Sequence, residues 1–167
     1  MSKKSFSIDF EHDYNFLLIG ICSPLKSYSI AYHLNKNIST ELQRSTEDIQ
    51  MVFPDGLEDA YFAQFEYLDI QFQNQWYLIA NKCKILCSEL DKNQGTIFDG
   101  LNQNRNKTKH LIPENPKVDF YLQIHGIYNE ESKSSLIKNI KNIERIVSVH
   151  EIDTNKLRSK ENLIIDE

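Results

Sequence analysis

The sequence predicts an α+β fold in which a mostly antiparallel sheet packs against two main helices. Apolar and polar side chains alternate over residues 118–125, and this period of two indicates a strand with one buried face. Apolar side chains recur at helical spacing over residues 24–37 and again over residues 136–147. The aromatic-rich region between residues 61 and 83 has the composition of paired antiparallel strands.

Length and composition are those of one globular domain. The chain has 167 residues, which suits a single domain over residues 1–167 with a substantial core. Its hydrophobic fraction of 40% and its charged fraction of 26% are ordinary for such a domain. The net charge of −5 argues against a dedicated binder of nucleic acid or of anionic membranes, and only a local basic patch would change that expectation.

The sequence favours a cytoplasmic protein. The lysines near the start are not followed by an apolar run, so no signal peptide is expected. The longest apolar run, residues 16–22, is far shorter than the ~20 residues that span a bilayer. Three cysteines cannot all pair with one another, which favours free thiols.

The N-terminal half is expected to contain a strand region within residues 6–21 and then a helix. Residues 16–21 are apolar on every side, so they fit either a central strand or the first turn of that helix. Ser23 is a suitable N-cap and Pro24 a suitable first helical residue, which predicts a helix from Pro24 to Asn37. Short strands and a turn are expected next, at residues 41–44, 49–53 and 54–56.

The middle of the chain is expected to form an antiparallel meander. A change of phase within the strand at residues 61–72 indicates a bulge or a turn near Asp69, and a hairpin turn at Gln73 and Asn74 is the alternative. Residues 76–83 then form the returning strand. Residues 88–110 are polar, with few apolar anchors, so we expect a flexible loop with a short element near Ile97.

The C-terminal third predicts a strand, a helix and a strand, at residues 118–127, from Asn129 to Val147, and at residues 146–152. If the two strands are parallel, the crossover is right-handed. This unit resembles half of a ferredoxin-like fold. A last short edge strand is expected at residues 163–165.

Residues 112–120, called here the signature segment, lead into the patterned strand. Pro113 and Pro116 stiffen the segment and remove two backbone donors. Ile112-Pro113-Glu114, followed after three residues by Val118-Asp119-Phe120, resembles the motif of the IPExxxVDY family of Bacteroidetes proteins, with Phe120 in place of tyrosine. Further blocks that resemble the family are residues 18–21, 28–36 and 78–82. The resemblance implies a shared fold and carries no activity with it.

Sequence motifs for catalysis, metals or cofactors are weak. The glycines are isolated, so neither a P-loop nor a dinucleotide-binding fingerprint is present, and Gly-x-Ser-x-Gly is also absent. Cys83 and Cys87 have the spacing of some zinc motifs but no second pair accompanies them. Cys22 precedes a predicted helix, yet packing as a small apolar residue is the preferred interpretation. We therefore expect no metal, no cofactor and no enzymatic activity.

Two basic runs and one pair of carboxylates are candidate sites. Residues 105–109 and 156–160 each contain three Lys or Arg, and an RNA-binding face would form if they met the aromatic meander. The acidic net charge makes nucleic acid the less favoured partner. Glu114 and Asp119 could form an acid/base pair, but we prefer that they hold the signature segment in place through backbone hydrogen bonds.

The sequence thus favours a non-enzymatic cytoplasmic interaction or accessory protein with an unidentified protein partner. The alternatives are a small-molecule-sensing regulatory module, by analogy of fold, and an RNA-associated accessory protein. The expected working surface is the outward face of the strand at residues 118–127, called here the signature strand, together with the signature segment. Its residues are Glu114, Asp119, Tyr121, Gln123 and His125. A merely solvated face is one alternative to this expectation. A terminal segment folded over the same face is the other.

Overall fold

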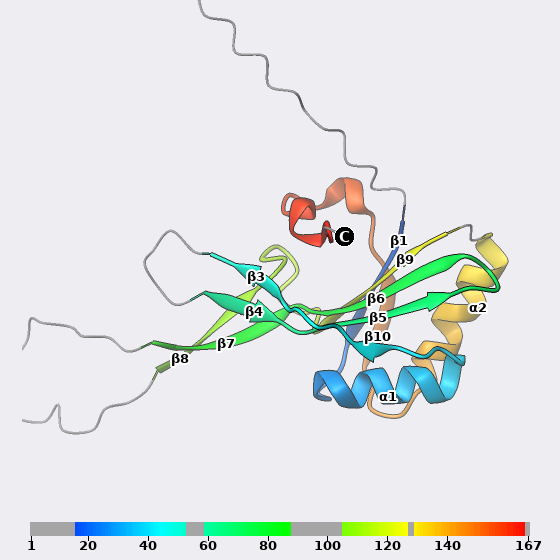
Figure 1. Ribbon diagram of the computed structural model, residues 1–167, viewed down its shortest axis with the longest axis horizontal. Coiled ribbons are helices and arrows are strands. Elements are labelled where there is room, and N and C mark those ends of the chain that lie inside the picture. Colours follow the sequence, from blue (N-terminus) through cyan, green and yellow to red (C-terminus); the bar gives the residue numbers. More distant parts are fainter. Residues whose placement is uncertain (1–15, 53–58, 88–104, 127–128, 166–167) are drawn as a thin grey trace, which may run out of the picture.

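A computed structural model describes residues 16–52, 59–87, 105–126 and 129–165 (Figure 1). The strands are β1 (Leu17–Cys22), β2 (Gln43–Arg44), β3 (Ile49–Met51), β4 (Ala60–Phe62), β5 (Gln64–Asp69), β6 (Asn74–Ala80), β7 (Lys82–Cys87), β8 (Arg105–His110), β9 (Phe120–His125) and β10 (Ser148–Glu151). The helices are α1 (Ser27–Ile38) and α2 (Glu130–Lys141), and two 3₁₀ turns follow at Thr154–Lys156 and Lys160–Leu163. The architecture is α+β, as the sequence predicts. The features expected at residues 6–15, 54–56 and near Ile97 lie outside the described residues.

Six strands form the main sheet, in the order β10-β1-β9-β6-β5-β2. All neighbours in this sheet are antiparallel. Because β9 and β10 are both antiparallel to β1, which lies between them, they are parallel to each other. The unit β9-α2-β10 is therefore a split βαβ arrangement, in agreement with the predicted likeness to half of a ferredoxin-like fold.

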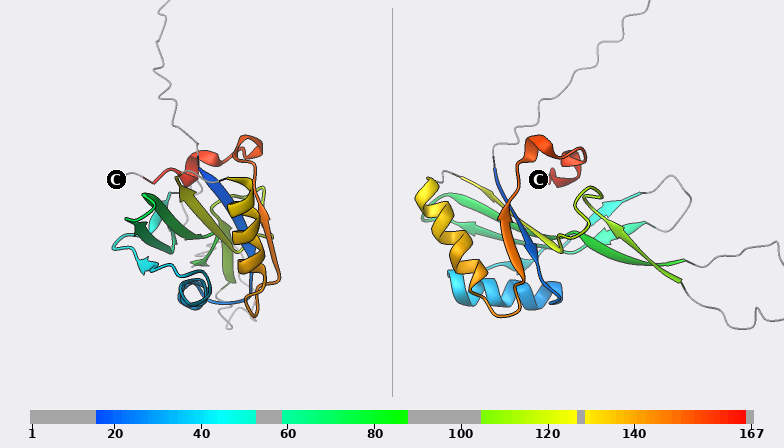
Figure 2. Two further views of the ribbon diagram at one scale, coloured as in Figure 1. Left: turned by 90° about the vertical axis from the view of Figure 1, so that its right-hand side faces the viewer. Right: turned by 180° about the vertical axis from the view of Figure 1, so that it is seen from behind.

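The main sheet is covered on both faces. One core contains Ile30 and Leu34 of α1 and Ile140 of α2, packed on alternate residues of the strands. Figure 2 shows both helices on this side of the sheet. The other core contains Phe62 of β4 together with Leu163 from the C-terminal segment. Strands between two cores must be apolar on both faces, which is why residues 17–22 form the strand β1 and not the start of a helix.

Helix α1 begins at Ser27, three residues later than predicted. The Ser23 hydroxyl accepts the Leu25 N–H at 3.3 Å and donates to the Arg145 carbonyl at 2.9 Å. Ser23 and the residues after it therefore make a turn that precedes the helix. The helix ends at Ile38, followed by Ser39 in the left-handed conformation at φ 55°.

Helix α2 is shorter than the apolar pattern predicts. The Asn129 side chain accepts the Ser132 N–H at 2.7 Å, which confirms the predicted N-cap. The helix ends at Lys141, and Arg145 has a φ of 69°, so the chain has left the helical path before Val147. Val147 was expected to lie on the buried stripe, but it is 73% exposed.

The strands in the middle of the chain also differ from the prediction. Ala63 separates β4 from β5, and the hairpin turn lies at residues 70–73. Residues 105–110, expected to belong to a flexible loop, form the strand β8 and pair with β7. Their polar side chains gave no strand signal, because much of this two-stranded sheet faces solvent. Residues 88–104 lie outside the described residues.

The C-terminal segment ends differently as well. Residues 163–165 were expected to form an edge strand. Instead, Leu163 closes a 3₁₀ turn and is completely buried.

Candidate functional site

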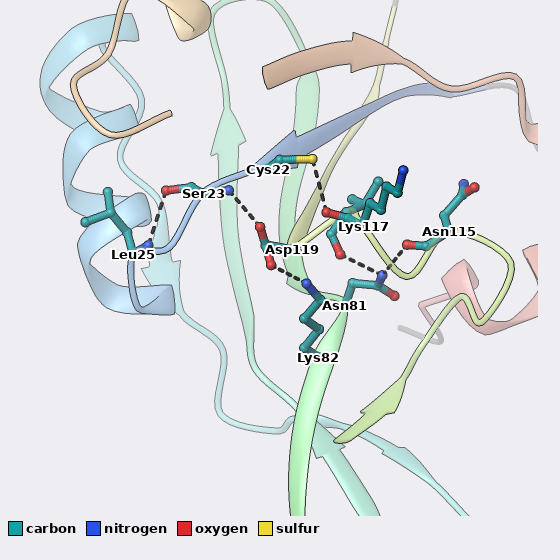
Figure 3. Close-up of polar contacts among 9 residues, drawn as sticks. Cys22, Ser23, Leu25, Asn81, Lys82, Asn115, Lys117 and Asp119 are labelled. Carbon is teal, nitrogen blue, oxygen red and sulfur yellow. Dashed lines mark hydrogen bonds and ion pairs between the residues drawn. The ribbon is translucent and has the colours of Figure 1, made fainter. Parts of the chain in front are cut away.

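The signature segment folds around the side chain of Asn81, which comes from another part of the chain (Figure 3). Asn81 is the bend between β6 and β7, and it is completely buried. Its side-chain Oδ1 accepts the Ile112 N–H at 2.8 Å. Its side-chain Nδ2 donates to the carbonyls of Asn115 at 3.0 Å and Val118 at 2.8 Å. Both ends of the amide are therefore bonded to the backbone of the signature segment.

The main chain of Asn81 binds the same region. Its N–H donates to the Asp119 carbonyl at 2.9 Å, and its carbonyl accepts the Leu111 N–H at 2.9 Å. Residues 111–119 thus wrap around one buried amide whose polar groups are all bonded. A buried amide satisfied in this way stabilises the fold, because leaving such a group without a partner costs about 1–3 kcal/mol.

Asp119 joins the signature segment to two other strands. Its Oδ2 accepts the Ser23 N–H at 2.8 Å, just beyond β1. Its Oδ1 accepts from Lys82 Nζ at 2.6 Å, at the start of β7. The carboxylate is three-quarters buried, with its side chain 25% exposed. These contacts are visible around Asp119 in Figure 3 and agree with the predicted structural function of this carboxylate.

Glu114 binds the C-terminal segment. Its Oε1 accepts the N–H groups of Arg158 at 2.7 Å and Ser159 at 2.8 Å, and its Oε2 accepts the Ser159 hydroxyl at 3.0 Å. Partial burial opposes ionisation, but the hydrogen bonds, led by that from the Ser159 N–H, hold the pKa of Glu114 below its ordinary value. The Glu114 carboxylate is therefore bound by two backbone N–H groups and one hydroxyl of the C-terminal segment, which is the holding function expected for it.

The polar residues in the middle of β9 are buried. Tyr121 is 0% exposed and Gln123 is 1% exposed. Burial raises the pKa of Tyr121, and the neighbouring Asn115 side chain opposes that rise. The Tyr121 hydroxyl nevertheless makes no hydrogen bond of good geometry within the described residues. The Gln123 Nε2 lies 2.7 Å from the His125 Nε2, whereas the Gln123 Oε1 has no partner there either. Neither side chain can contribute to a solvent-exposed binding surface.

His125, at the end of β9, is half-buried between aromatic rings. Its ring centroid lies 5.1 Å from that of Phe16 and 5.8 Å from that of Tyr77, with the second pair nearly perpendicular. Such edge-to-face packing is favourable for aromatic rings. The ring therefore lies between Phe16, just before β1, and Tyr77 of β6.

The predicted working surface is therefore wrong. Tyr121 lies in the core that contains Leu157 and Leu163, so the C-terminal segment folds over this face of the sheet. A terminal segment over this face is the second alternative to the predicted working surface. Of the five predicted residues, Glu114 and Asp119 hold elements together, Tyr121 and Gln123 are interior, and His125 packs against aromatic rings.

Cys22 and Cys83 are the cysteines whose side chains the structure describes. Cys22 and Cys83 are free, and Cys22 Sγ donates to the Lys117 carbonyl at 3.1 Å (Figure 3). This contact joins the thiol to the backbone of the signature segment. Within residues 16–52, 59–87, 105–126 and 129–165, no group of three His, Cys, Asp or Glu side chains could hold a metal ion.

The turn between β5 and β6 carries exposed apolar side chains, and the sequence pattern did not predict this surface. Residues 68–73, called here the hairpin tip, carry Leu68, Ile70 and Phe72, with exposed fractions of 57%, 81% and 67%. Their alternation in the sequence predicts only a strand, at residues 61–72. Tyr28 and Tyr32, one turn apart on α1, are also more than half exposed.

Comparison of the chain with protein-family models, with curated proteins and with solved structures finds no match in any of the three. The described helices include none with the length and apolar character needed to cross a membrane.

Proposed function

We propose that this is a non-enzymatic cytoplasmic interaction protein that binds a protein partner through the hairpin tip. The observation that carries the proposal is the exposure of Leu68, Ile70 and Phe72 together on one turn. Scattered single apolar residues are normal on a surface, whereas adjacent ones are typical of interaction sites. Membership of the IPExxxVDY family is proposed with it, on the resemblance of the signature segment and of residues 18–21, 28–36 and 78–82.

The hairpin tip is built as an ordered turn. Asp69 Oδ1 accepts the N–H groups of Gln71 at 3.1 Å and Phe72 at 3.2 Å. Gln73 adopts a left-handed φ of 53°, and the returning strand starts at Asn74, which is buried. A turn that is already ordered loses little conformational entropy on binding, so more of the gain from apolar burial becomes affinity.

The chemistry of the hairpin tip suggests its partner. The tip supplies three aliphatic or aromatic side chains beside the carboxylates of Glu66 and Asp69. A complementary surface is an apolar pocket with a basic rim, since opposite charges around an apolar centre give specificity and faster association.

We assign no catalysis to the two carboxylates of the signature segment, because both bind hydrogen-bond donors within the fold.

A photo-crosslinking residue tests this function when it is placed at Gln71 in the hairpin tip. The matched control carries the same residue at Asn37, an exposed position at the end of α1. In native cytoplasm, we expect one dominant covalent partner from position 71 and none from position 37. The crosslink should disappear when Ile70→Ser and Phe72→Ser are added. Equal products from both positions, or a crosslink unaffected by those substitutions, would refute the proposal.

A small-molecule-sensing module is the second candidate. It is supported by two polar atoms on one face of β9, the Tyr121 hydroxyl and Gln123 Oε1, which are buried and have no described partner. Buried polar atoms without partners are rare and can mark a binding site. A metabolite that raises the melting temperature of the wild-type protein but not of a Tyr121→Phe variant would favour this candidate.

A further inference from the structure

Helix α1 presents two tyrosines and one lysine to solvent in a single row. Tyr28 and Tyr32 are 63% and 60% exposed, and Lys36 is exposed as well. The three residues are four positions apart in sequence, so they lie one helical turn apart on one side of the helix. The other side of α1 carries Ile30 and Leu34, which are completely buried. These three exposed residues are called here the tyrosine row.

The fold itself explains only part of the tyrosine row. A lysine in the last turn of a helix complements the helix dipole, which accounts for Lys36. The two rings have no such use, because they lie outside the core and tyrosine is only a moderate helix former. Single exposed apolar residues are normal on a surface, whereas adjacent ones are typical of interaction sites.

The groups of the tyrosine row are available for contact. Helix α1 contains no Asp or Glu, and Lys36 forms no ion pair with another residue that the structure describes. The ring of Tyr32 lies edge-on to the ring of His33, with centroids 5.5 Å apart. This packing helps to fix the orientation of the Tyr32 ring before binding, so less conformational entropy is lost when the ring is covered.

We propose that α1 binds α1 of a second copy of this chain, in an antiparallel twofold dimer centred on Tyr32. The row is evenly spaced, so a twofold axis at Tyr32 brings the two Tyr32 rings together. The same axis places Tyr28 of each copy beside Lys36 of the other. Ridges of residues four apart pack against each other when two helices cross at about −50°, the commonest crossing in globular proteins.

The chemistry of the tyrosine row matches itself. The two Tyr32 rings can stack with an offset or meet edge to face, which are the favourable arrangements of an aromatic pair. A lysine ammonium is attracted to the face of a tyrosine ring, and the twofold axis makes this contact twice. Tyrosine is also enriched at the centres of interfaces. One helix thus supplies both the rings and the cations that its partner requires, which is why the partner inferred is an identical chain.

The position and length of α1 set the strength of this contact. Figure 2 shows α1 near the lower edge of the molecule in both views. The helix has 12 residues. A helix of that length is about 18 Å long, and two of them bury less than the roughly 1,600 Å² of a standard stable interface. The dimer is therefore weak and forms at micromolar or higher protein concentrations.

This contact is separate from the proposed protein partner, because it uses α1 and not the hairpin tip. Asn37 lies about 140° around the helix from Tyr32 and makes its own bond to the His33 carbonyl at 2.7 Å. The crosslinking control at position 37 therefore lies outside the tyrosine row. Failure of one proposal leaves the other intact.

The test is sedimentation equilibrium of the full chain over a wide range of protein concentration. The mass should rise from that of one chain to that of two as the concentration increases. Tyr32→Ala removes the central pair and should weaken the dimer at least about tenfold. The matched control, Tyr61→Ala, removes a tyrosine of β4 that is 53% exposed and should leave the dimer unchanged.

A pair of charged variants tests the antiparallel register. Tyr28→Lys places a lysine beside Lys36 of the other copy and should abolish the dimer. Tyr28→Lys combined with Lys36→Glu should restore it, because each new lysine then meets a glutamate of the other copy. Within one chain the two positions are about 12 Å apart along the helix, which is too far for an ion pair. Recovery therefore reports a contact between two chains.

Three results would overturn the proposal. The first is a chain that stays monomeric at every concentration. The second is a dimer that Tyr32→Ala, shown by circular dichroism to be folded, weakens no more than Tyr61→Ala does. The third is a Tyr28→Lys, Lys36→Glu double variant that stays as monomeric as Tyr28→Lys alone, which would reject the pairing of residues 28 and 36.

Discussion

The side-chain amide of Asn81 donates to the backbone carbonyl of Val118 at 2.8 Å, although 37 residues separate the two in the chain. This bond joins the bend between β6 and β7 to a residue two positions before the signature strand β9. It is one of five hydrogen bonds between Asn81 and residues 111–119, each of which uses a backbone group of that segment. The signature segment is therefore part of the framework of the fold.

Glu114→Gln should lower stability at pH 7. The folded-state pKa of Glu114 lies below its ordinary value of 4.5, so folding favours the carboxylate. The stabilisation is present above pH 4.5 and is lost as the pH falls through the lowered folded-state pKa. We expect a loss of about 1 kcal/mol at pH 7, because the site is partly exposed, and convergence with wild type in acid. Urea denaturation measured from pH 7 to pH 2 checks this.

The control for Glu114→Gln is Glu47→Gln, which removes an exposed carboxylate. It should have the same stability as wild type across the pH range. If the Glu114 variant follows the control, then Glu114 does not hold the C-terminal segment.

Tyr121→Phe should leave stability unchanged or raise it slightly. The ring of Tyr121 fills the core, and its buried hydroxyl makes no hydrogen bond of good geometry to any residue that the structure describes. Removing an unsatisfied polar group while keeping the ring removes a desolvation cost. A matched Tyr77→Phe variant changes another buried tyrosine of the same core. A thermal melting temperature for Tyr121→Phe that falls by more than about 4 °C would show that the hydroxyl is bonded after all.

Gly126→Ala should destabilise the protein by about 1–3 kcal/mol. Gly126 has a φ of 148°, and a Cβ atom there would lie 1.7 Å from Asn74 Oδ1. Gln73→Gly is the contrast, since Gln73 already has a positive φ of 53° and gains backbone freedom in both states. Its stability should stay within about 0.5 kcal/mol of wild type in urea denaturation. Equal effects of the two substitutions would contradict the close packing at Gly126.

The sequence predicted the elements better than it predicted their surroundings. Periodicity identified β9 and both helices, because alternation and helical spacing are local properties. It also predicted that Tyr121 and Gln123 face outward, since their side chains are polar. Their burial depends on Leu157 and Leu163, more than 30 residues later, and local periodicity contains no information about such a cover.

The same limit applies to the candidate site. The sequence predicts only that Asn81 belongs to the strand at residues 76–83, because its partners are backbone groups of residues 111–119, which no side-chain motif reveals. Glu114 and Asp119 were correctly expected to hold the segment, since carboxylates beside prolines and strand ends often accept backbone N–H groups. The strand β8 was missed because its polar side chains resemble those of a loop.

The most direct test of the structural function of the signature segment is urea denaturation of Asn81→Asp beside Asn37→Asp. The first substitution removes two donors from buried carbonyls and buries a carboxylate, which should cost at least about 3 kcal/mol. The second makes the same chemical change at an exposed amide that donates to the His33 carbonyl at 2.7 Å, and should cost less than about 1 kcal/mol. Equal unfolding free energies for the two variants would contradict the account, because the Asn81 amide could not then be what holds residues 111–119.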